Sequence, residues 1–249
     1  MPDRELQVGR PVPASGEQAR SFDRVADAYE RGRPGWPPEV LDLVPVPDET
    51  TVLDLGAGTG KLTRVLAARY AHVIALEPLA EMRAILAEHV PAAEPLPGVA
   101  EAIPLEDAAV DAVFVGQAFH WFANDIAVAE IARVLRPGGV LARMWNESVD
   151  PLPLPPEYEQ RLSDLHEAMQ PPEVPDDVFE GKPFGEVHVG AVDHEHVSSR
   201  DEVLAFAASV SWIANRDDRD EVLAELSSLL PDRDYTFHMR TNFEWARRD

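Results

Sequence analysis

The feature that most constrains this chain is a short apolar run followed at once by three closely spaced glycines. Residues 52–63 read Val-Leu-Asp-Leu-Gly-Ala-Gly-Thr-Gly-Lys-Leu-Thr. The apolar residues suit a strand that is covered on both faces, and the glycines let a ligand approach the backbone closely. Residues 61–70 then carry apolar side chains at helical spacing. The segment therefore predicts a strand, a tight turn that receives a ligand, and a helix.

Several kinds of nucleotide site share such a turn, and the residues around the glycines distinguish them. A P-loop requires a glycine five places before its Gly-Lys pair and Ser or Thr after it, whereas this chain has Leu55 and Leu62. A dinucleotide fingerprint counted from Gly56 requires a small residue where Lys61 stands. The P-loop interpretation therefore fails, and the dehydrogenase interpretation is weakened but stays open. Asp54 completes the remaining pattern, acidic-x-Gly-x-Gly-x-Gly.

The next segments continue an alternation of strands and helices. Residues 72–77 predict a second strand that ends on Glu77, placed to accept hydrogen bonds from two ribose hydroxyls. Residues 111–118 predict another strand, and a helix follows over about 125–135. Arg-Pro-Gly-Gly at 136–139 ends that helix and leads into a strand over 140–145. This order is typical of an α/β fold with a parallel sheet.

Taken together, these motifs resemble the class I S-adenosylmethionine-dependent methyltransferases over about residues 20–146. The chain is most similar to a small-molecule branch that includes trans-aconitate methyltransferase-like proteins. Three segments carry that similarity: Phe22-Asp23-x-x-Ala26-x-x-Tyr29-x-x-x-Arg33-Pro34-x-Trp36-Pro37, Ala100-Glu101-x-Ile103-Pro104 and Gln117-Ala118-Phe119-His120-Trp121-Phe122. The resemblance implies a doubly wound Rossmann-like sheet, mostly parallel with an antiparallel final strand. It also implies S-adenosyl-L-methionine as cofactor and S-adenosyl-L-homocysteine as product.

The resemblance further implies a set of cofactor-binding residues. Tyr29 and Arg33 would close over the methionine carboxylate, which Arg can grip with two parallel hydrogen bonds. Asp54 would orient the turn and the methionine end, or serve only as a buried acceptor of the turn. The family often has an acidic residue where this chain has Val99, so adenine recognition would rely on Glu101 or on main-chain groups. The set comprises Tyr29, Arg33, Asp54, Gly56, Gly58, Gly60, Glu77, Pro78, Ala100, Glu101 and Gln117.

The expected chemistry is an SN2 displacement on a sulfonium methyl group, so much of the rate can come from alignment and exclusion of water. A base is needed only where the acceptor is protonated, and His120 is the candidate because imidazole titrates near neutral pH. A packed wall residue is the alternative for His120. The candidate substrate contacts are Trp36, His120, Trp121 and Arg143, although Arg143 equally suits an ion pair with a carboxylate. We expect a small-molecule acceptor with a reactive oxygen, either carboxylate or hydroxyl. An NAD-type oxidoreductase and a non-catalytic cofactor-binding protein are the alternatives.

Composition narrows the partners. The chain has 249 residues, 22 of them basic and 45 acidic, and its formal net charge of −23 repels nucleic acid and anionic membranes. It contains no cysteine, which excludes thiolate catalysis and disulfides. Neither an apolar run of membrane-spanning length nor a signal-peptide pattern is apparent, so we expect a cytoplasmic protein. The oligomeric state is not predicted.

We expect a single domain over residues 1–249 with four parts. A helix in 19–37 would lie over the site, 40–146 would form the cofactor-binding core, and 147–183 would form a small helical cap after the fifth strand. Residues 184–249 would complete the sheet as strand, helix and strand. His188, His194 and His196 share strand parity, which suits either a metal site or an exposed strand face. The face is favoured, and no metal is expected.

Overall fold

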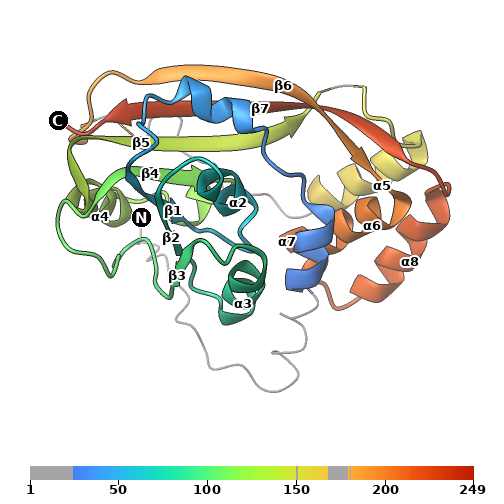
Figure 1. The fold of residues 1–249 in the computed structure, drawn as a ribbon. Helices are drawn as coiled ribbons and strands as arrows, with labels where there is room; N and C mark the ends of the chain where they lie inside the picture. Colours follow the sequence, from blue (N-terminus) through green and yellow to red (C-terminus); the bar gives the residue numbers. More distant parts are fainter. Residues whose placement is uncertain (1–24, 150, 168–178, 180) are drawn as a thin grey trace, which may run out of the picture.

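The computed structural model describes residues 25–149, 151–167, 179 and 181–249. Its centre is one sheet of seven strands in the order β3-β2-β1-β4-β5-β7-β6 (Figure 1). Strands β1 to β5 pair in parallel, and β7 runs antiparallel to both β5 and β6. The predicted sheet, mostly parallel with an antiparallel final strand, is therefore confirmed. The strands are β1 (Thr51–Leu55), β2 (His72–Leu76), β3 (Glu94–Leu96), β4 (Val110–Gly116), β5 (Leu135–Ser148), β6 (His188–Ser198) and β7 (Tyr235–Arg247).

Helices cover both faces of the sheet, as the apolar run of β1 requires. Val52 packs in a cluster with η1 and α2, whereas Leu53 and Leu55 pack in a second cluster with α4 on the opposite face. All three side chains are fully buried. The helices of this part are η1 (Pro38–Leu43), α2 (Lys61–Ala67), α3 (Ala80–His89), η2 (Phe119–Trp121) and α4 (Asp125–Val134). Residues 25–32 form a further helix before η1.

A separate helical cluster lies at one end of the long strands β5 to β7 (Figure 1). It contains α5 (Pro156–Glu167), α6 (Arg200–Ser209), α7 (Ser211–Ala214) and α8 (Arg219–Leu229). The one helix predicted within residues 184–249 is divided into three helices, α6, α7 and α8, because Val210 has extended dihedral angles and residues 215–218 interrupt the helix after α7. Tyr158 of α5 and Tyr235 of β7 are buried in the core that these helices share.

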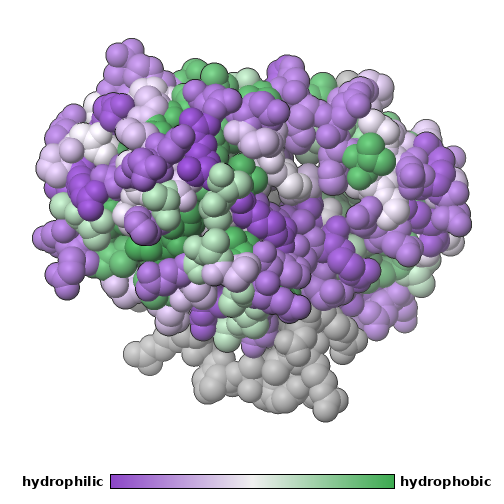
Figure 2. Space-filling view, in the orientation of Figure 1, coloured by the Kyte–Doolittle hydropathy of each residue, from purple (hydrophilic) through white to green (hydrophobic). Residues whose placement is uncertain are grey.

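Parts of the predicted organisation lie outside the described residues. These parts are residues 19–24 of the N-terminal segment, including Phe22 and Asp23, and residues 150, 168–178 and 180 of the predicted cap. The described part of that cap contributes α5, which packs with α7 and α8. Hydrophilic residues cover most of the face seen in Figure 2. In the described ranges, every helix is too short or too polar to cross a membrane.

Candidate functional site

The glycine turn connects β1 to α2 at the carboxyl edge of the sheet. Gly56, Gly58 and Gly60 all have positive φ angles, of 74°, 57° and 88°. At Gly56 a side chain is excluded by space as well, because an added Cβ would lie 2.7 Å from the Cβ of Ala118. The main-chain N–H groups of Gly56 and Ala57 donate to the carbonyl oxygen of Leu76 at 2.9 and 3.1 Å. The turn is therefore tied to the end of β2.

Glu77 follows β2 directly, and its carboxylate faces the glycine turn. One oxygen accepts the Gly58 N–H at 2.9 Å, and the other accepts the Leu79 N–H at 2.9 Å. Arg83 of α3 donates to the carbonyl oxygens of Glu77 and Pro78, both at 2.7 Å. Burial raises the pKa of the Glu77 carboxyl, against the lowering effect of its two main-chain bonds and of Arg83. Each carboxylate oxygen keeps a second lone pair for another donor.

Asp54 is buried at the end of β1, with 1% of its surface exposed. Its carboxyl accepts a hydrogen bond from the Thr63 hydroxyl at 2.6 Å. Burial is the main cause that raises its pKa to about 7, and the nearby Glu77 charge raises it further. The Thr63 bonds act in the opposite direction. Asp54 therefore titrates near neutral pH.

A cavity of about 220 Å³ opens beside this turn. It lies where β1, β4 and β5 end, and the N-terminal helix, α2 and α6 also contribute to its wall. Six residues predicted for the site line it: Tyr29, Arg33, Trp36, Asp54, Gly56 and Gln117. Nine further residues that were not in the predicted site set also line it, and among them are Lys61, Asn146, Ser148, Phe206 and Met239. The last two come from the C-terminal third of the chain, beyond residues 20–146, whose motifs carried the resemblance in the sequence.

Arg33 places a cation in the wall of the cavity. Its Nε donates to the Ser209 hydroxyl at 3.1 Å, and its guanidinium lies over the rings of Tyr29 and Phe206, at 5.2 and 4.8 Å from their centres. Within the described ranges it forms no ion pair, and its two terminal nitrogens have no hydrogen-bond acceptor. Burial lowers the pKa of Arg33. The aromatic rings thus hold a guanidinium that can still receive an anion.

Gln117 follows β4 and has a φ of +55°, an uncommon conformation for a residue with a side chain. Its main-chain N–H donates to Met144 at 2.9 Å, and its side-chain amide donates to the Asn146 carbonyl at 3.1 Å. These two bonds to β5 keep Gln117 at the cavity wall. Strained residues of this kind are concentrated at functional sites.

His120 and Trp121 lie on η2, and neither lines the cavity. Trp121 is 69% exposed, and its ring lies 4.6 Å from that of His120. Partial burial and the positive charge of Arg33 lower the pKa of His120. His120 is therefore mostly neutral near pH 7 and lies within electrostatic reach of Arg33.

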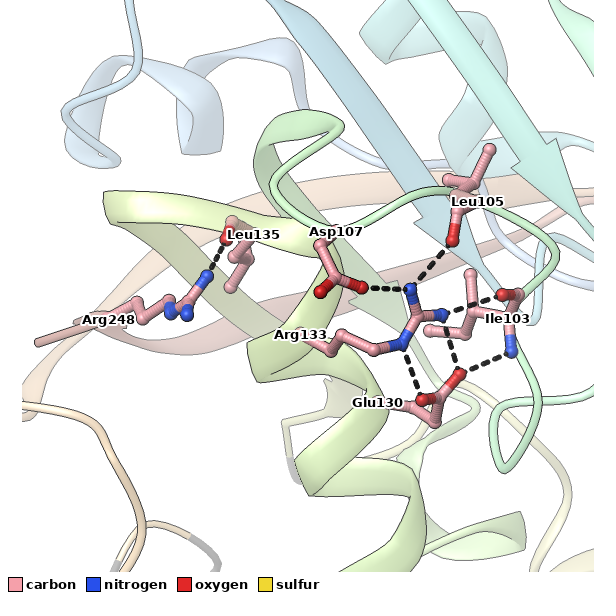
Figure 3. A network of polar contacts seen from close by, with 7 residues as sticks. All are labelled: Ile103, Leu105, Asp107, Glu130, Arg133, Leu135 and Arg248. Carbon is pink, nitrogen blue, oxygen red and sulfur yellow. Dashed lines mark hydrogen bonds and ion pairs between the residues drawn. The ribbon is translucent and has the colours of Figure 1, made fainter.

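Ala100 and Glu101 lie in the loop between β3 and β4, which α4 holds in place. Arg133 of α4 donates to the carbonyl oxygens of Ile103 and Leu105 at 2.9 and 2.8 Å (Figure 3). The same guanidinium pairs with Glu130, whose carboxylate accepts the Ile103 N–H at 2.9 Å. Glu101 accepts a hydrogen bond at 2.9 Å from Asn124, the residue that caps α4. The loop and the helix start are thus linked.

Arg143 does not join these residues. Its guanidinium pairs with Glu244 of β7 at 2.6 Å and lies 5.7 Å from the centre of the Phe119 ring, on the α4 side of the sheet. Side chains alternate along β5, so Met144 faces the opposite side and Asn146 faces the cavity. The structure therefore corrects the expectation of a substrate contact, and the ion pair, its alternative, is what forms.

Each of the three histidines of β6 interacts with a nearby side chain that is not a metal ligand. His194 bonds to the Thr241 hydroxyl at 3.0 Å, His196 to the Ser198 hydroxyl at 2.9 Å, and His188 stacks on Trp245 at 4.0 Å between ring centres. Across the part of the chain that the structure describes, there is no cluster of three or more His, Asp or Glu side chains with the arrangement of a metal site.

Comparison with known proteins identifies the family. A family described as a methyltransferase domain matches residues 53–142. A methyltransferase-like protein of Schizosaccharomyces pombe is 35% identical over 219 residues, which cover 82% of this chain and 83% of that protein. The chain belongs to the class I S-adenosylmethionine-dependent methyltransferases.

Other methyltransferases match over shorter stretches. An uncharacterized methyltransferase of Mycobacterium tuberculosis is 49% identical over 130 residues, so that the match spans about half of each protein, 52% of this chain and 54% of the relative. Malonyl-[acyl-carrier protein] O-methyltransferase of Methylococcus capsulatus is 43% identical over 102 residues, 39% of this chain and 37% of that protein. Among solved structures, a candidate type II methyltransferase of Anaeromyxobacter dehalogenans shares the fold with a TM-score of 0.60 at 22% identity, covering 87% and 97% of the two chains.

Proposed function

We propose that this chain transfers a methyl group from S-adenosyl-L-methionine to an oxygen atom of a small-molecule acceptor. The observation that carries the proposal is that Glu77 contacts the glycine turn at one edge of the sheet, beside a cavity lined by Arg33. The Arg33 guanidinium forms no ion pair with any residue that the structure describes. When bound, the cofactor supplies a methyl group on a sulfonium sulfur, which is a good leaving group. The residues of the chain then have to bind, align and exclude water.

The residues present fit such a cofactor. The Glu77 carboxylate is aimed by two main-chain N–H groups and keeps lone pairs for two ribose hydroxyls. Gly58 leaves room beside the turn, because an added Cβ would meet no atom closer than the Tyr29 ring at 3.8 Å. Arg33 offers its terminal nitrogens to the methionine carboxylate. The linked loop that carries Ala100 and Glu101 would serve the adenine.

For the acceptor, the wall of the cavity supplies Trp36, and Gln117 of the cofactor set lines the same wall. His120 is the candidate base for a hydroxyl acceptor, because a neutral imidazole can take a proton. A carboxylate acceptor requires no base. The relative from Methylococcus capsulatus is named as an O-methyltransferase, which supports oxygen as the acceptor atom. We include the organisation of the chain in the proposal: a single domain over residues 1–249, in which residues 147–183 form a small helical cap.

Two other functions can be distinguished experimentally, one by the binding of NADH and the other by the absence of methyl transfer. An NAD-type oxidoreductase is opposed by Lys61, because its dinucleotide fingerprint places a small residue there to bring helix and strand close together. A protein that binds the cofactor without turnover would retain Glu77 and Arg33 but lack methyl transfer to every acceptor tested. Tight binding of NADH, with one site per chain, would contradict the proposal.

Calorimetric titration with S-adenosylhomocysteine tests the ribose assignment. Glu77→Ala removes an anionic acceptor of hydrogen bonds, so we expect the dissociation constant to rise about 100-fold, equivalent to about 3 kcal/mol. Glu88→Ala removes an exposed carboxylate from α3 and serves as the matched control. Urea unfolding of both variants without ligand separates loss of the fold from loss of binding. An unchanged dissociation constant for a folded Glu77→Ala variant would refute the assignment.

A further inference from the structure

The wall of the cavity at β5 contains an amide whose orientation is determined by its neighbours. Asn146 faces the main-chain carbonyl of Gly35 at 3.1 Å, and a carbonyl only accepts hydrogen bonds, so the facing atom is Nδ2. The Oδ1 atom therefore faces Thr241, whose hydroxyl donates to it. The Thr241 hydroxyl has one hydrogen, which it donates to Asn146. Its oxygen can therefore only accept a hydrogen bond from His194, so Nε2 of His194, 3.0 Å away, carries the proton.

These hydrogen bonds determine which atoms of the Asn146 side chain can bind a ligand in the cavity. One N–H of its amide goes to Gly35, and the second has no acceptor among the described residues. Ser148 adds a hydroxyl to the same wall, and its one hydrogen bond to a described residue is a contact of 3.4 Å with the sulfur of Met239. A thioether sulfur is a weak acceptor, so that hydroxyl is easily redirected. This part of the wall therefore presents hydrogen-bond donors.

Lys61 brings a positive charge to the cavity. It is the first residue of α2, where the positive end of the helix dipole disfavours a cation, so local structure does not explain its presence. Its ammonium group forms no hydrogen bond or ion pair with a described residue. The carboxylates of Glu30 and Glu202 act on Lys61 electrostatically, but neither lies within ion-pair distance of its ammonium group. Arg64 binds one oxygen of Glu30, the other oxygen of Glu30 is buried without a hydrogen-bond partner among the described residues, and Ser199 binds Glu202. Lys61 is thus a cavity cation that forms no ion pair with a described residue.

From these contacts we propose that Lys61, Asn146 and Ser148 bind the methyl acceptor, and that the acceptor is a small carboxylic acid in its ionised form. The inference rests on the proposed function, in which Arg33 is occupied by the methionine carboxylate. A carboxylate oxygen attacks the methyl carbon, a new C–O bond forms, and the electron pair of the broken C–S bond stays on sulfur. No proton is released, and the negative charge of the acid and the positive charge of the sulfonium both disappear.

Thr241 is a positioning residue in this arrangement, because it acts on the acceptor only through Asn146. Thr241→Val removes the donor to Oδ1 and frees the amide to turn. Thr241→Ser keeps that donor, so we expect it to bind the acid as the wild type does, whereas Thr241→Val should bind the acid more weakly. Since Thr241 is fully buried, the valine variant also requires a check of its unfolding curve.

Binding to protein saturated with S-adenosylhomocysteine tests the proposal without turnover. The probes are glutarate, hexanoate and benzoate, each compared by calorimetry with its uncharged amide. We expect at least one acid to bind the wild type at least ten times more tightly than its amide. Lys61→Gln and Asn146→Asp should each remove that preference and leave the dissociation constant of S-adenosylhomocysteine within twofold of the wild type.

Matched controls are available for both substitutions. Lys182→Gln makes the same charge change away from the cavity, where Lys182 pairs with Asp125. Asn215→Asp alters an exposed amide after α7. Acids and amides that bind alike, an absence of binding by every acid, or a preference that survives both substitutions would overturn the inference. No heat with S-adenosylhomocysteine itself would instead contradict the proposed function.

Discussion

Asp54 makes the stability of this protein depend on pH in a direction opposite to that of a typical paired carboxylate. In the folded state its pKa is about 7, against an ordinary value of 3.8. The folded protein therefore holds a proton on Asp54 at pH values where the unfolded chain has lost it. By linkage, the stability due to this group is complete below about pH 4 and is lost as pH rises to about 7. At about 1.4 kcal/mol per pH unit, the full loss is on the order of 4 kcal/mol.

Asp54→Asn removes this titration and retains an oxygen that can accept the Thr63 hydroxyl. Its new amide hydrogens are buried, so we expect the variant to be less stable than the wild type near pH 4, by about 1–3 kcal/mol. From about pH 5 to about pH 8, its stability relative to the wild type should rise by about 3 kcal/mol.

Urea unfolding at four pH values between 5 and 8 measures this difference directly, and subtraction of the two curves cancels the other titrating groups. Asp217→Asn changes an exposed carboxylate and should give a pH profile parallel to that of the wild type. Parallel profiles for Asp54→Asn and the wild type would refute the argument that burial keeps this carboxyl protonated.

Two further predictions concern the surroundings of Arg33. Arg33 lowers the pKa of His120, so Arg33→Gln should raise it, and an unchanged histidine titration by NMR would show that the two charges do not interact. Gly32→Ala would place a Cβ 2.0 Å from the main-chain nitrogen of Phe206, and we expect a loss of about 1–3 kcal/mol in urea unfolding because backbone of α6 must move. At Gly35 an added Cβ meets no atom within 4 Å, so Gly35→Ala is the control, and equal stability losses for the two variants would contradict the packing argument.

The sheet and the glycine turn were predictable because their causes are local. The apolar residues of β1 identify a strand covered on both faces, and the positive φ angles after it require glycine. Glu77 was predictable as a strand-end acid for the same reason, although its two main-chain donors were not visible in the sequence. Local signals of this kind extend as far as β5.

The cavity wall was harder to predict because it combines residues from distant segments. Arg143 was expected at the site, but strand parity directs it to the α4 side, and its neighbours in the sheet decide its partner. Asn146 lies three residues further along the same strand, on the side of the cavity. Its role depends on Gly35 and Thr241, which lie about a hundred residues away on either side. No pattern within one segment could reveal that arrangement.

The net charge of −23 does not by itself determine which ligand the cavity can bind. Surface carboxylates act over about 8 Å in physiological salt, so the groups lining the cavity decide its potential. Outside the cavity, cations such as Arg69, Arg133 and Arg240 are paired with carboxylates. The two in the cavity wall, Arg33 and Lys61, have no such partner among the described residues. Burial raises the pKa of Asp54, a carboxylate that shares their cavity, to about 7, which reduces its negative charge near neutral pH. An acidic chain can therefore keep two cations free of ion pairs with described residues in a cavity wall, where an anion would bind.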